Sequence, residues 1–447
     1  MRKRSILTGF ILWLCSNVAI AQVRDTVKVL TLEDAILTAL EKNHNIRVSR
    51  IEAAISENNV TLGNAGLLPS LSLQGSYTKS IRDVKTSFIN PQIESINRQN
   101  AASSTVNGAV VLSYNIFNGL GSYYQFNSLQ NLSRIGNVQA RLTIENTLLQ
   151  AVIQYLEAAR LQQLLEINRE AMEISRERYN RVNIKYEFGT ITKLDVLNAK
   201  VDLNADSTLY LSTVADYRNA LRNLNLLLGR EPEASMVVEE EIALNRDLQL
   251  EVLLAEAMAV NSNLLLAEYL RQDARLNLNI ARSGYYPRVD VNAAYNYNRI
   301  KDDASFLNLS RTDGFSGTIT LSYNLFNGFQ QRTQVENARM ALAASDEALD
   351  LAADQVKRDV RNAYEIYRNN LYLLQLAQDD LTTSRLNFER SQEAYATGLI
   401  NSTDLRTAQL NLINSQNRIN NLRIMAKSSE IELYRLAGRL LLESSSK

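Results

Sequence analysis

The sequence contains one unusual eight-residue phrase twice. LSYNIFNG occupies residues 112–119 and LSYNLFNG occupies residues 321–328, so the two copies lie 209 residues apart and differ at one letter. The same offset pairs identical residues without a gap as far as residue 229: Tyr186 with Tyr395, Gly189 with Gly398, Asp195 with Asp404, Ala199 with Ala408, Leu203 with Leu412 and Gly229 with Gly438. A repeat of this length predicts that the chain consists of two structurally equivalent halves.

Upstream of the phrase the two halves pair at a different offset, 218 residues. It matches Asn43 with Asn261 and Pro69 with Pro287. The first half therefore has nine more residues than the second, between Pro69 and residue 112. Because loops accept insertions that packed elements do not, we expect this difference in a surface loop. The chain is thus divided into a first repeat, an acidic linker and a second repeat, at residues 22–229, 230–248 and 249–440.

The first 21 residues have the pattern of a secretory signal peptide. Three basic residues at positions 2–4 precede an apolar run, and a small-residue cleavage site ends at Ala21. Cys15 is the only cysteine and lies in this segment, so the exported chain is expected to have no thiol and no disulfide. At the other end, residues 441–447 are expected to be a disordered tail.

The charge and hydropathy of the remaining chain exclude two classes of protein. Three of the 48 Lys and Arg side chains lie in the signal segment, which leaves 45 against 48 acidic side chains and no basic region that would attract nucleic acid. We find no apolar run that approaches the ~18 residues of a transmembrane helix. Strands therefore have to carry this chain into any membrane that it enters.

Each half has a helical stretch followed by two strands of alternating polarity. The helical stretches are expected at residues 30–66 and 249–284, and Pro69 and Pro287 are expected to end them and to switch the chain from helix to strand. After Pro287, the sequence RVDVNAAYNYN places apolar residues on one face and polar residues on the other. The four strands are expected at about residues 70–80, 105–116, 288–298 and 316–325. Strands of ~10 residues cross a membrane when they are tilted.

Very long helices are expected to follow each pair of strands. The repeated phrase ends with Asn118 and Gly119, or with Asn327 and Gly328, and each Asn-Gly pair permits a positive-φ turn from strand to helix. The expected helices run at about residues 124–188, 192–228, 333–397 and 402–438. The longer ones have roughly 65 residues, about 100 Å at 1.5 Å per residue. A seven-residue recurrence predicts that the helices pack as a coiled coil; its members in the second half are Val360, Tyr367, Leu374, Leu381, Phe388 and Tyr395.

Four membrane strands do not close a barrel, because the smallest known closed membrane barrels have about eight. Open strand edges in lipid leave backbone groups unpaired, so several copies of the chain have to associate. Two copies give eight strands and an interior filled by side chains, whereas three give twelve strands and room for a lumen. The helices then extend from the membrane as a tube.

The chain resembles the outer-membrane efflux family typified by TolC, over essentially all of residues 30–440. The matching features are the twofold repeat, the proline before each strand pair, the repeated phrase after it, and the helical-turn phrases YEFGTITKLDVLNA and YATGLINSTDLRTA. The resemblance implies a mainly α-helical fold with a membrane β-barrel portion, in which a homotrimer forms a twelve-stranded barrel that continues into a periplasmic α-helical barrel. It also implies a Gram-negative outer-membrane location, the function of an exit duct, and two partners, a periplasmic adaptor protein and an inner-membrane transporter.

The same resemblance places adaptor docking and channel gating at the two helical turns. Eight residues are candidates for these roles. The candidates for adaptor docking are Gly189, Thr190, Gly398 and Leu399. The candidates for a gate or constriction are Tyr186, Asp195, Tyr395 and Asp404. Each group has a structural alternative: the glycines end helices, the tyrosines continue the coiled-coil seam, and the aspartates stabilise helix starts through the helix dipole. In three copies the aspartates would instead form a carboxylate ring in a narrow pore.

Two positions depart from the family's pattern. The second acidic position, three residues after each aspartate, is Asn198 or Thr407 here. The gate arginine, two residues after each turn glycine, is replaced by Ile191 or Ile400. The constriction charge and the ionic latch of the family therefore cannot be carried over to this chain.

No catalytic constellation and no cofactor are expected. His44 is the only histidine and the exported chain has no cysteine, so a His/Cys metal site is excluded. We find no nucleophile with a histidine base and no glycine-rich phosphate loop. Two functions remain, a passive outer-membrane exit duct and a non-conducting periplasmic coiled-coil structural protein. The two alternating strand pairs behind prolines favour the duct.

Overall fold

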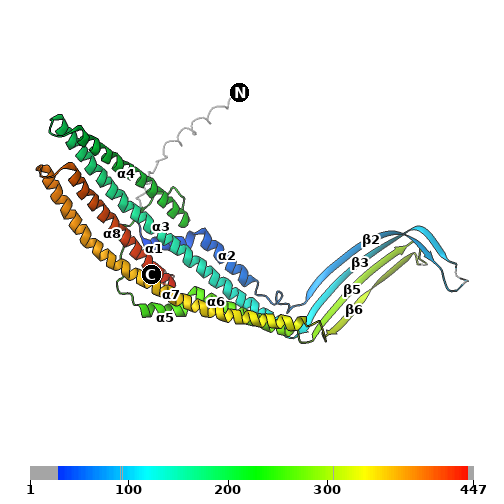
Figure 1. The fold of residues 1–447 in the computed structure, drawn as a ribbon. Helices are drawn as coiled ribbons and strands as arrows, with labels where there is room; N and C mark the ends of the chain where they lie inside the picture. The colour runs from blue at the N-terminus through cyan, green and yellow to red at the C-terminus, as the bar shows by residue number, and fades with distance from the viewer. Residues whose placement is uncertain (1–28, 91, 93, 306, 441–447) are drawn as a thin grey trace, which may run out of the picture.

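The computed structural model describes residues 29–90, 92, 94–305 and 307–440. The expected signal peptide with Cys15 and the expected tail lie outside these residues. The described chain is elongated: a curved four-stranded sheet forms one end, and long helices run from it to two turns at the other end (Figure 1). A strand-built end and a helix-built end are thus separated along one axis.

The sheet has the strand order β2-β3-β5-β6, and its three neighbouring pairs are all antiparallel. Its strands are β2 (Ser70–Thr86), β3 (Ile96–Asn118), β5 (Arg288–Asp302) and β6 (Leu309–Ser322). β2 and β6 are the edges, and neither has a second strand partner among the described residues.

The two faces of the sheet differ in polarity because the strand register aligns like residues across it. One row of paired residues is Leu73, Val110, Tyr295 and Phe315. The next row, on the opposite face, is Gln74, Ala109, Asn296 and Gly314. The alternation read from the sequence therefore produces one apolar and one polar face.

Several strand ends differ from their expected positions. β2 and β3 continue through polar sequence to a loop at 87–95, whereas β5 and β6 are joined at 303–308. The nine extra residues of the first half thus mainly lengthen a hairpin, and the expectation of an insertion confined to a loop was wrong. β2 and β3 stay paired in this polar sequence because their backbone groups still need hydrogen-bond partners. Such backbone pairing does not require apolar side chains.

β6 ends at Ser322, three residues earlier than expected. The equivalent residues of the first half, in the same phrase, remain in β3 because they pair with β5. Among the described residues of one protomer, β6 has no strand on its outer side, so the same sequence forms a strand in one half and not in the other.

Two long helices carry the chain away from the sheet. α3 (Gly121–Glu187) and α7 (Gln330–Ala396) have 67 residues each. Each is followed by a returning helix of 35 residues, α4 (Lys193–Leu227) or α8 (Ser402–Leu436). The expected seam of α7 is observed, because five of its six members are buried: Val360, Tyr367, Leu374, Phe388 and Tyr395.

The shorter helices differ from the expected ones. Each expected stretch is two helices, α1 (Leu32–Lys42) and α2 (His44–Asn58) in the first half, α5 (Leu250–Val260) and α6 (Ser262–Ser283) in the second. The prediction of one continuous helix in each half was therefore wrong. α2 also ends well before Pro69, so that proline does not end the helix, although Pro69 and Pro287 both immediately precede a strand.

Asn43 and Asn261 break the two stretches in the same way. Each has an extended backbone, and its side-chain oxygen accepts hydrogen bonds from two N–H groups of the next helix. Each Nδ2 also donates to a carbonyl at the end of a returning helix, Leu227 O at 2.7 Å or Leu436 O at 3.0 Å. The two hydrogen bonds join equivalent residues, because Asn43 matches Asn261 at the offset of 218 and Leu227 matches Leu436 at the offset of 209. The repeat is therefore visible even in single hydrogen bonds.

Asn261→Ala is expected to lower the free energy of unfolding by about 2 kcal/mol, because the helix cap is lost and Leu436 O loses its donor. Denaturant unfolding of the full-length protein, followed by circular dichroism at 222 nm, measures this change. Asn263→Ala, at an exposed position of the same turn, is the control, with an expected effect within about 0.5 kcal/mol. Equal effects of the two substitutions would rule out the buried amide as their source.

Short elements from both halves form a collar on the middle of the long helices. We define the collar as residues 29–43, which contain β1 (Val29–Leu30) and α1, together with residues 230–261, which contain β4 (Val237–Val238) and α5. β1 and β4 pair in parallel, and Met236 and Val238 are buried. The acidic segment 230–248 is therefore packed through its apolar residues, while its glutamates remain exposed.

Two equivalent tyrosines, one in each half, help to attach the collar to the long helices. The hydroxyl of Tyr155 donates to Leu30 O at 2.9 Å, and the hydroxyl of Tyr364 donates to Leu248 O at 3.2 Å. These bonds are again equivalent under the sequence offsets. Burial raises the pKa of Tyr155 to about 12, so its hydroxyl remains a donor at neutral pH.

One helical segment, Leu250–Ser283, is long and apolar enough to cross a membrane, which the sequence analysis did not expect. In the structure it is two helices, α5 and α6, with the extended Asn261 between them. Leu253 and Ala257 of α5 are buried in the collar core, and α6 packs between α3 and α7. Part of the apolar surface of this segment is therefore used to pack the helical body, and 22% of its most apolar window is buried.

Candidate functional site

The repeated phrase ends in a turn that changes strand into helix. Gly119 and Leu120 both have left-handed backbone conformations, with φ of 67° and 66°. Asn118 Oδ1 accepts a hydrogen bond from Ser122 N at 3.1 Å and so caps the long helix that follows. The second half has the same geometry at Asn327, Gly328 and Phe329. Two successive left-handed residues thus change the chain direction within a short length.

The long helices end in two turns at the end of the molecule far from the sheet (Figure 1). Gly189 and Gly398 are left-handed there, with φ of 70° and 79°. The next residue, Thr190 or Leu399, donates its N–H to the carbonyl five residues earlier, a common way for a glycine to end a helix. A Cβ at either glycine would meet nothing within 4 Å, so both turns are open to a partner.

Asp195 and Asp404 both cap returning helices. Asp195 Oδ2 accepts from Thr192 N at 3.0 Å and from Thr192 Oγ1 at 2.7 Å, and Asp404 forms the same kind of capping box with Asn401. The hydrogen bonds from Thr192 hold the pKa of Asp195 below its usual value. Asp404 is exposed and Asp195 is partly exposed in the protomer, so a carboxylate that caps a helix can also lie on a pore wall.

The two candidate gate tyrosines have different surroundings. Tyr395 is 6% exposed and packs against Phe388 and Leu405, whereas Tyr186 is 38% exposed. Lys185 Nζ of α3 lies 4.6 Å from the ring centroid of Tyr395, and this cation–π contact joins the two helical hairpins. Within the described protomer the Tyr395 hydroxyl has no hydrogen-bond partner, so apolar packing and the contact with Lys185 account for this residue here.

A buried charge cluster joins the two helical hairpins between the turns and the collar. We define it as Ser175 and Arg178 of α3, Asp202 and Asp206 of α4, and Arg406 of α8. Arg406 binds both carboxylate oxygens of Asp206, at 2.6 and 2.8 Å. Arg178 Nη2 lies 2.5 Å from Asp202 Oδ2, and Arg178 Nη1 donates to Ser402 O at 3.4 Å. Because α8 belongs to the second half, the cluster links the halves directly.

Sequence reasoning missed the charge cluster, although one signal for it was present. Asp206 lies in a seven-residue seam of α4 whose other buried members are Ala199, Thr213 and Ala220. A carboxylate in such a seam requires a buried partner. The repeat did not identify that partner, because the position equivalent to Arg406 is Leu197.

The described residues contain no group of three or more His, Cys, Asp or Glu side chains that could hold a metal ion. His44 is exposed at the start of α2. The chemistry of the candidate site is therefore hydrogen bonding, ion pairing and apolar packing.

Residues 35–230 and 253–439 match the protein family described as Outer membrane efflux protein. The two matched stretches correspond to the two repeats. Outer membrane protein TolC of Vibrio cholerae is 23% identical to this chain over 394 residues, which cover 85% of this chain and 84% of TolC.

Two solved structures are similar in fold. A membrane protein from Pseudomonas aeruginosa has a TM-score of 0.75 at 14% identity, with 91% of this chain and 90% of that chain covered. The CmeC outer membrane channel of Campylobacter jejuni has a TM-score of 0.73 at 15% identity, with 93% and 89% covered. These similarities confirm the predicted fold class. The chain belongs to the outer membrane efflux protein family, and it is a Gram-negative outer-membrane protein whose helices extend into the periplasm.

Proposed function

We propose that three copies of this chain form the exit duct of a tripartite efflux or type I secretion system. One observation carries the proposal: a four-stranded sheet with an apolar face and two unpaired edges continues directly into long helices. In lipid, such edges are stable only when they pair with further strands. β6 of one copy therefore pairs with β2 of the next, and three copies close a twelve-stranded barrel with its apolar face outward.

In this assembly the helices continue the wall of the barrel. α2, α3, α6 and α7 contact one another in the same order as the four strands. Three copies then give a ring of twelve helices beneath twelve strands, and the polar sheet face lines a water-filled passage. Substrates pass through without a chemical step, and the inner-membrane transporter supplies the energy.

We further propose that the helical turns bind a periplasmic adaptor and control the opening. Phe188 and Leu399, which flank the turn glycines, are each 80% exposed and offer apolar contacts to a partner helix. Three copies of Asp195 and Asp404 form a carboxylate ring at the narrow end, which attracts cations. The buried Tyr395 positions α7 in that end through its contact with Lys185.

Single-channel conductance of the purified trimer in planar bilayers tests this function. We expect small, cation-selective steps that divalent cations block, because clustered carboxylates concentrate cations. Asp404→Asn removes three charges from the assembly but keeps an oxygen that can cap α8. The concentration of divalent cation needed for half-block is expected to rise about tenfold, which corresponds to about 1.4 kcal/mol of lost attraction.

Asp195→Asn is the matched control, because Asp195 has the same capping position in the first repeat. An effect of Asp404→Asn alone assigns the constriction to the second repeat, and equal effects assign it to both. If neither substitution changes the block, the duct is retained and its narrow point lies elsewhere. No conductance from inserted, trimeric protein would instead support the non-conducting coiled-coil function.

A further inference from the structure

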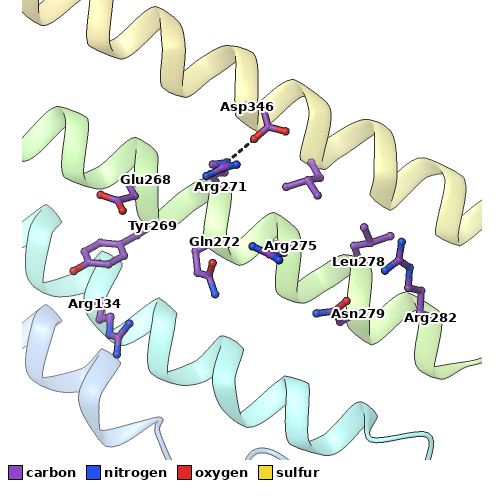
Figure 2. Close-up of a pocket in the computed structure, with 11 residues that line it drawn as sticks. Arg134, Glu268, Tyr269, Arg271, Gln272, Arg275, Leu278, Asn279, Arg282 and Asp346 are labelled. Carbon is purple, nitrogen blue, oxygen red and sulfur yellow. Dashed lines mark hydrogen bonds and ion pairs between the residues drawn. The ribbon is translucent and has the colours of Figure 1, made fainter.

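A groove on the helical body lies close to the sheet. It has a volume of about 700 Å³ and is lined by residues of α3, α6 and α7. Figure 2 shows α6 as its floor between the two longer helices, with Arg134 on the α3 side and Asp346 on the α7 side. Its α6 residues recur at three- and four-residue spacing from Glu268 to Arg282, so they share one face of the helix.

The groove is basic. Its charged lining residues are Arg134, Arg271, Arg275, Arg282, Glu268 and Asp346. Arg271 is neutralised locally, because its Nε lies 2.5 Å from Asp346 Oδ1, the contact drawn as a dashed line in Figure 2. Among the described residues, the guanidinium groups of the other three arginines form no hydrogen bond or ion pair within the protomer. The groove therefore presents unpaired guanidinium groups to solvent.

The groove faces the outside of the proposed tube. Arg134 lies three heptads before Tyr155 on α3, and Asp346 lies three heptads before Tyr367 on α7. In helices packed with a seven-residue repeat, residues three heptads apart share a face. Both tyrosine hydroxyls donate to backbone carbonyls of the collar, so the groove and the collar are on the same face. That face is the outer one, because three collars on the inner face would fill the passage.

The groove remains accessible when three copies associate as proposed. Its floor, α6, lies between α3 and α7 and away from the strand edges at which copies meet. The face opposite the groove is also exposed, for example at Leu270 and Asn277, as expected of a wall one helix thick. A ligand thus reaches the groove from the periplasm or along the membrane surface.

The position of the groove along the chain places its upper end at the membrane surface. Arg282 is in the last turn of α6, and β5 begins six residues later at Arg288. Tyr285 and Tyr286 between them are 47% and 60% exposed, as is typical of aromatic residues at a membrane interface. Each headgroup layer is about 5–7 Å thick, and in the proposed assembly Arg282 is the groove arginine nearest to that layer, since it is the one closest in sequence to β5. Arg275 lies roughly 10 Å farther from the sheet, and its long side chain extends toward that layer.

We propose that this groove binds the phosphate of an anionic phospholipid headgroup from the periplasmic leaflet, with Arg282 and Arg275 as its ligands. A guanidinium binds phosphate through two parallel hydrogen bonds, and basic pockets beside a membrane select anionic headgroups. The inference rests on the proposed function for the membrane position of the sheet. Its consequence is a fixed depth of the barrel in the membrane, set by lipid contacts at three equivalent grooves.

Native mass spectrometry of the purified full-length protein, titrated with phosphatidylglycerol or phosphatidylcholine, tests the proposal. Wild-type protein is expected to retain phosphatidylglycerol in preference to phosphatidylcholine. The double variant Arg275→Gln/Arg282→Gln is expected to bind phosphatidylglycerol at least about tenfold more weakly, because each arginine near an anionic surface contributes about fivefold. Arg361→Gln/Arg385→Gln, two exposed arginines of α7 outside the groove, removes the same charge and is expected to bind as wild type does.

Further measurements separate the possible ligands. Displacement by millimolar inorganic phosphate, without a preference for phosphatidylglycerol, would overturn the lipid assignment in favour of a soluble phosphate compound. Displacement by polyglutamate with no lipid retention would overturn it in favour of an acidic protein segment. Equal weakening in both double variants would reduce the effect to net charge. Conductance of the same samples keeps the two proposals distinct. Loss of lipid binding with normal conductance would reject only the proposed lipid site in the groove. Retained lipid binding without conductance would reject only the proposed function as a duct.

Discussion

Replacing Asp206 with alanine is expected to lower the free energy of unfolding by about 3–5 kcal/mol, because the buried guanidinium of Arg406 loses its bidentate partner. The two side chains are only 8% and 12% exposed, so water does not compensate. Ser175 Oγ, which donates to the same carboxylate at 2.5 Å, loses its acceptor as well. Denaturant unfolding followed by circular dichroism gives the size of the change, and hydrogen exchange of α8 locates it.

Ser415→Ala is the matched control for Asp206→Ala, because Ser415 occupies the equivalent position of the second repeat. Ser415 is buried and forms hydrogen bonds with Ser384 and Asp380, but it has no charge. Its replacement is expected to cost about 1 kcal/mol. In the assembled duct, Asp206→Ala is also expected to enlarge the conductance steps, since it weakens the link between the hairpins. Similar stabilities of the two variants would contradict a structural role for the charge cluster.

Gly119→Ala is expected to prevent the strand-to-helix junction from forming. A left-handed alanine costs roughly 1 kcal/mol more than glycine. In addition, its Cβ would lie 2.5 Å from Ser283 O and 2.7 Å from Tyr286 Cβ. Backbone atoms do not rotate away as flexible side chains do, so the total cost is expected to exceed about 3 kcal/mol. The measurement is the yield of folded protein in isolated outer membranes, compared with wild type at equal expression.

Gly328→Ala provides the internal control, because Gly328 has the same backbone conformation in the second repeat, with φ of 64°. A Cβ there would meet nothing within 4 Å in the protomer, so only the conformational cost of about 1 kcal/mol is expected. Loss of trimers with folding of the protomer intact would show that a neighbouring copy occupies this space. Equal folding defects in both variants would contradict the steric explanation for Gly119.

Most of the fold was predictable because its signals are local and occur twice. The alternation after Pro287 and the seven-residue seam that ends at Tyr395 each depend on short-range periodicity. Asn118 and Gly119 marked the junction because few residue pairs adopt left-handed turns without strain. Each signal in one half was supported by its counterpart in the other, which made the long helices and the tip turns recognisable.

The features that were missed depend on contacts between distant segments. Asn43 breaks a stretch of good helix formers through a bond to Leu227, far along the chain. β6 ends at Ser322, although β3 continues through the same phrase in the first half. The part of the protomer that the structure describes has no strand on the outer side of β6 to pair with these residues. The charge cluster pairs Asp206 with Arg406, and neither residue has a charged counterpart in the other repeat. No local pattern contains this information.

The two hairpins of one chain also differ in height, which has a consequence at the cell surface. β2 and β3 remain paired as far as Thr86 and Ile96, whereas β5 and β6 pair only as far as Lys301 and Leu309. When three copies close the proposed barrel, three longer hairpins alternate with three shorter ones around its rim. A phage tail or an antibody that approaches from outside would meet the loop at 87–95 first. In the proposed assembly, the nine extra residues of the first repeat therefore lie in the part of the protein that is most exposed at the cell surface.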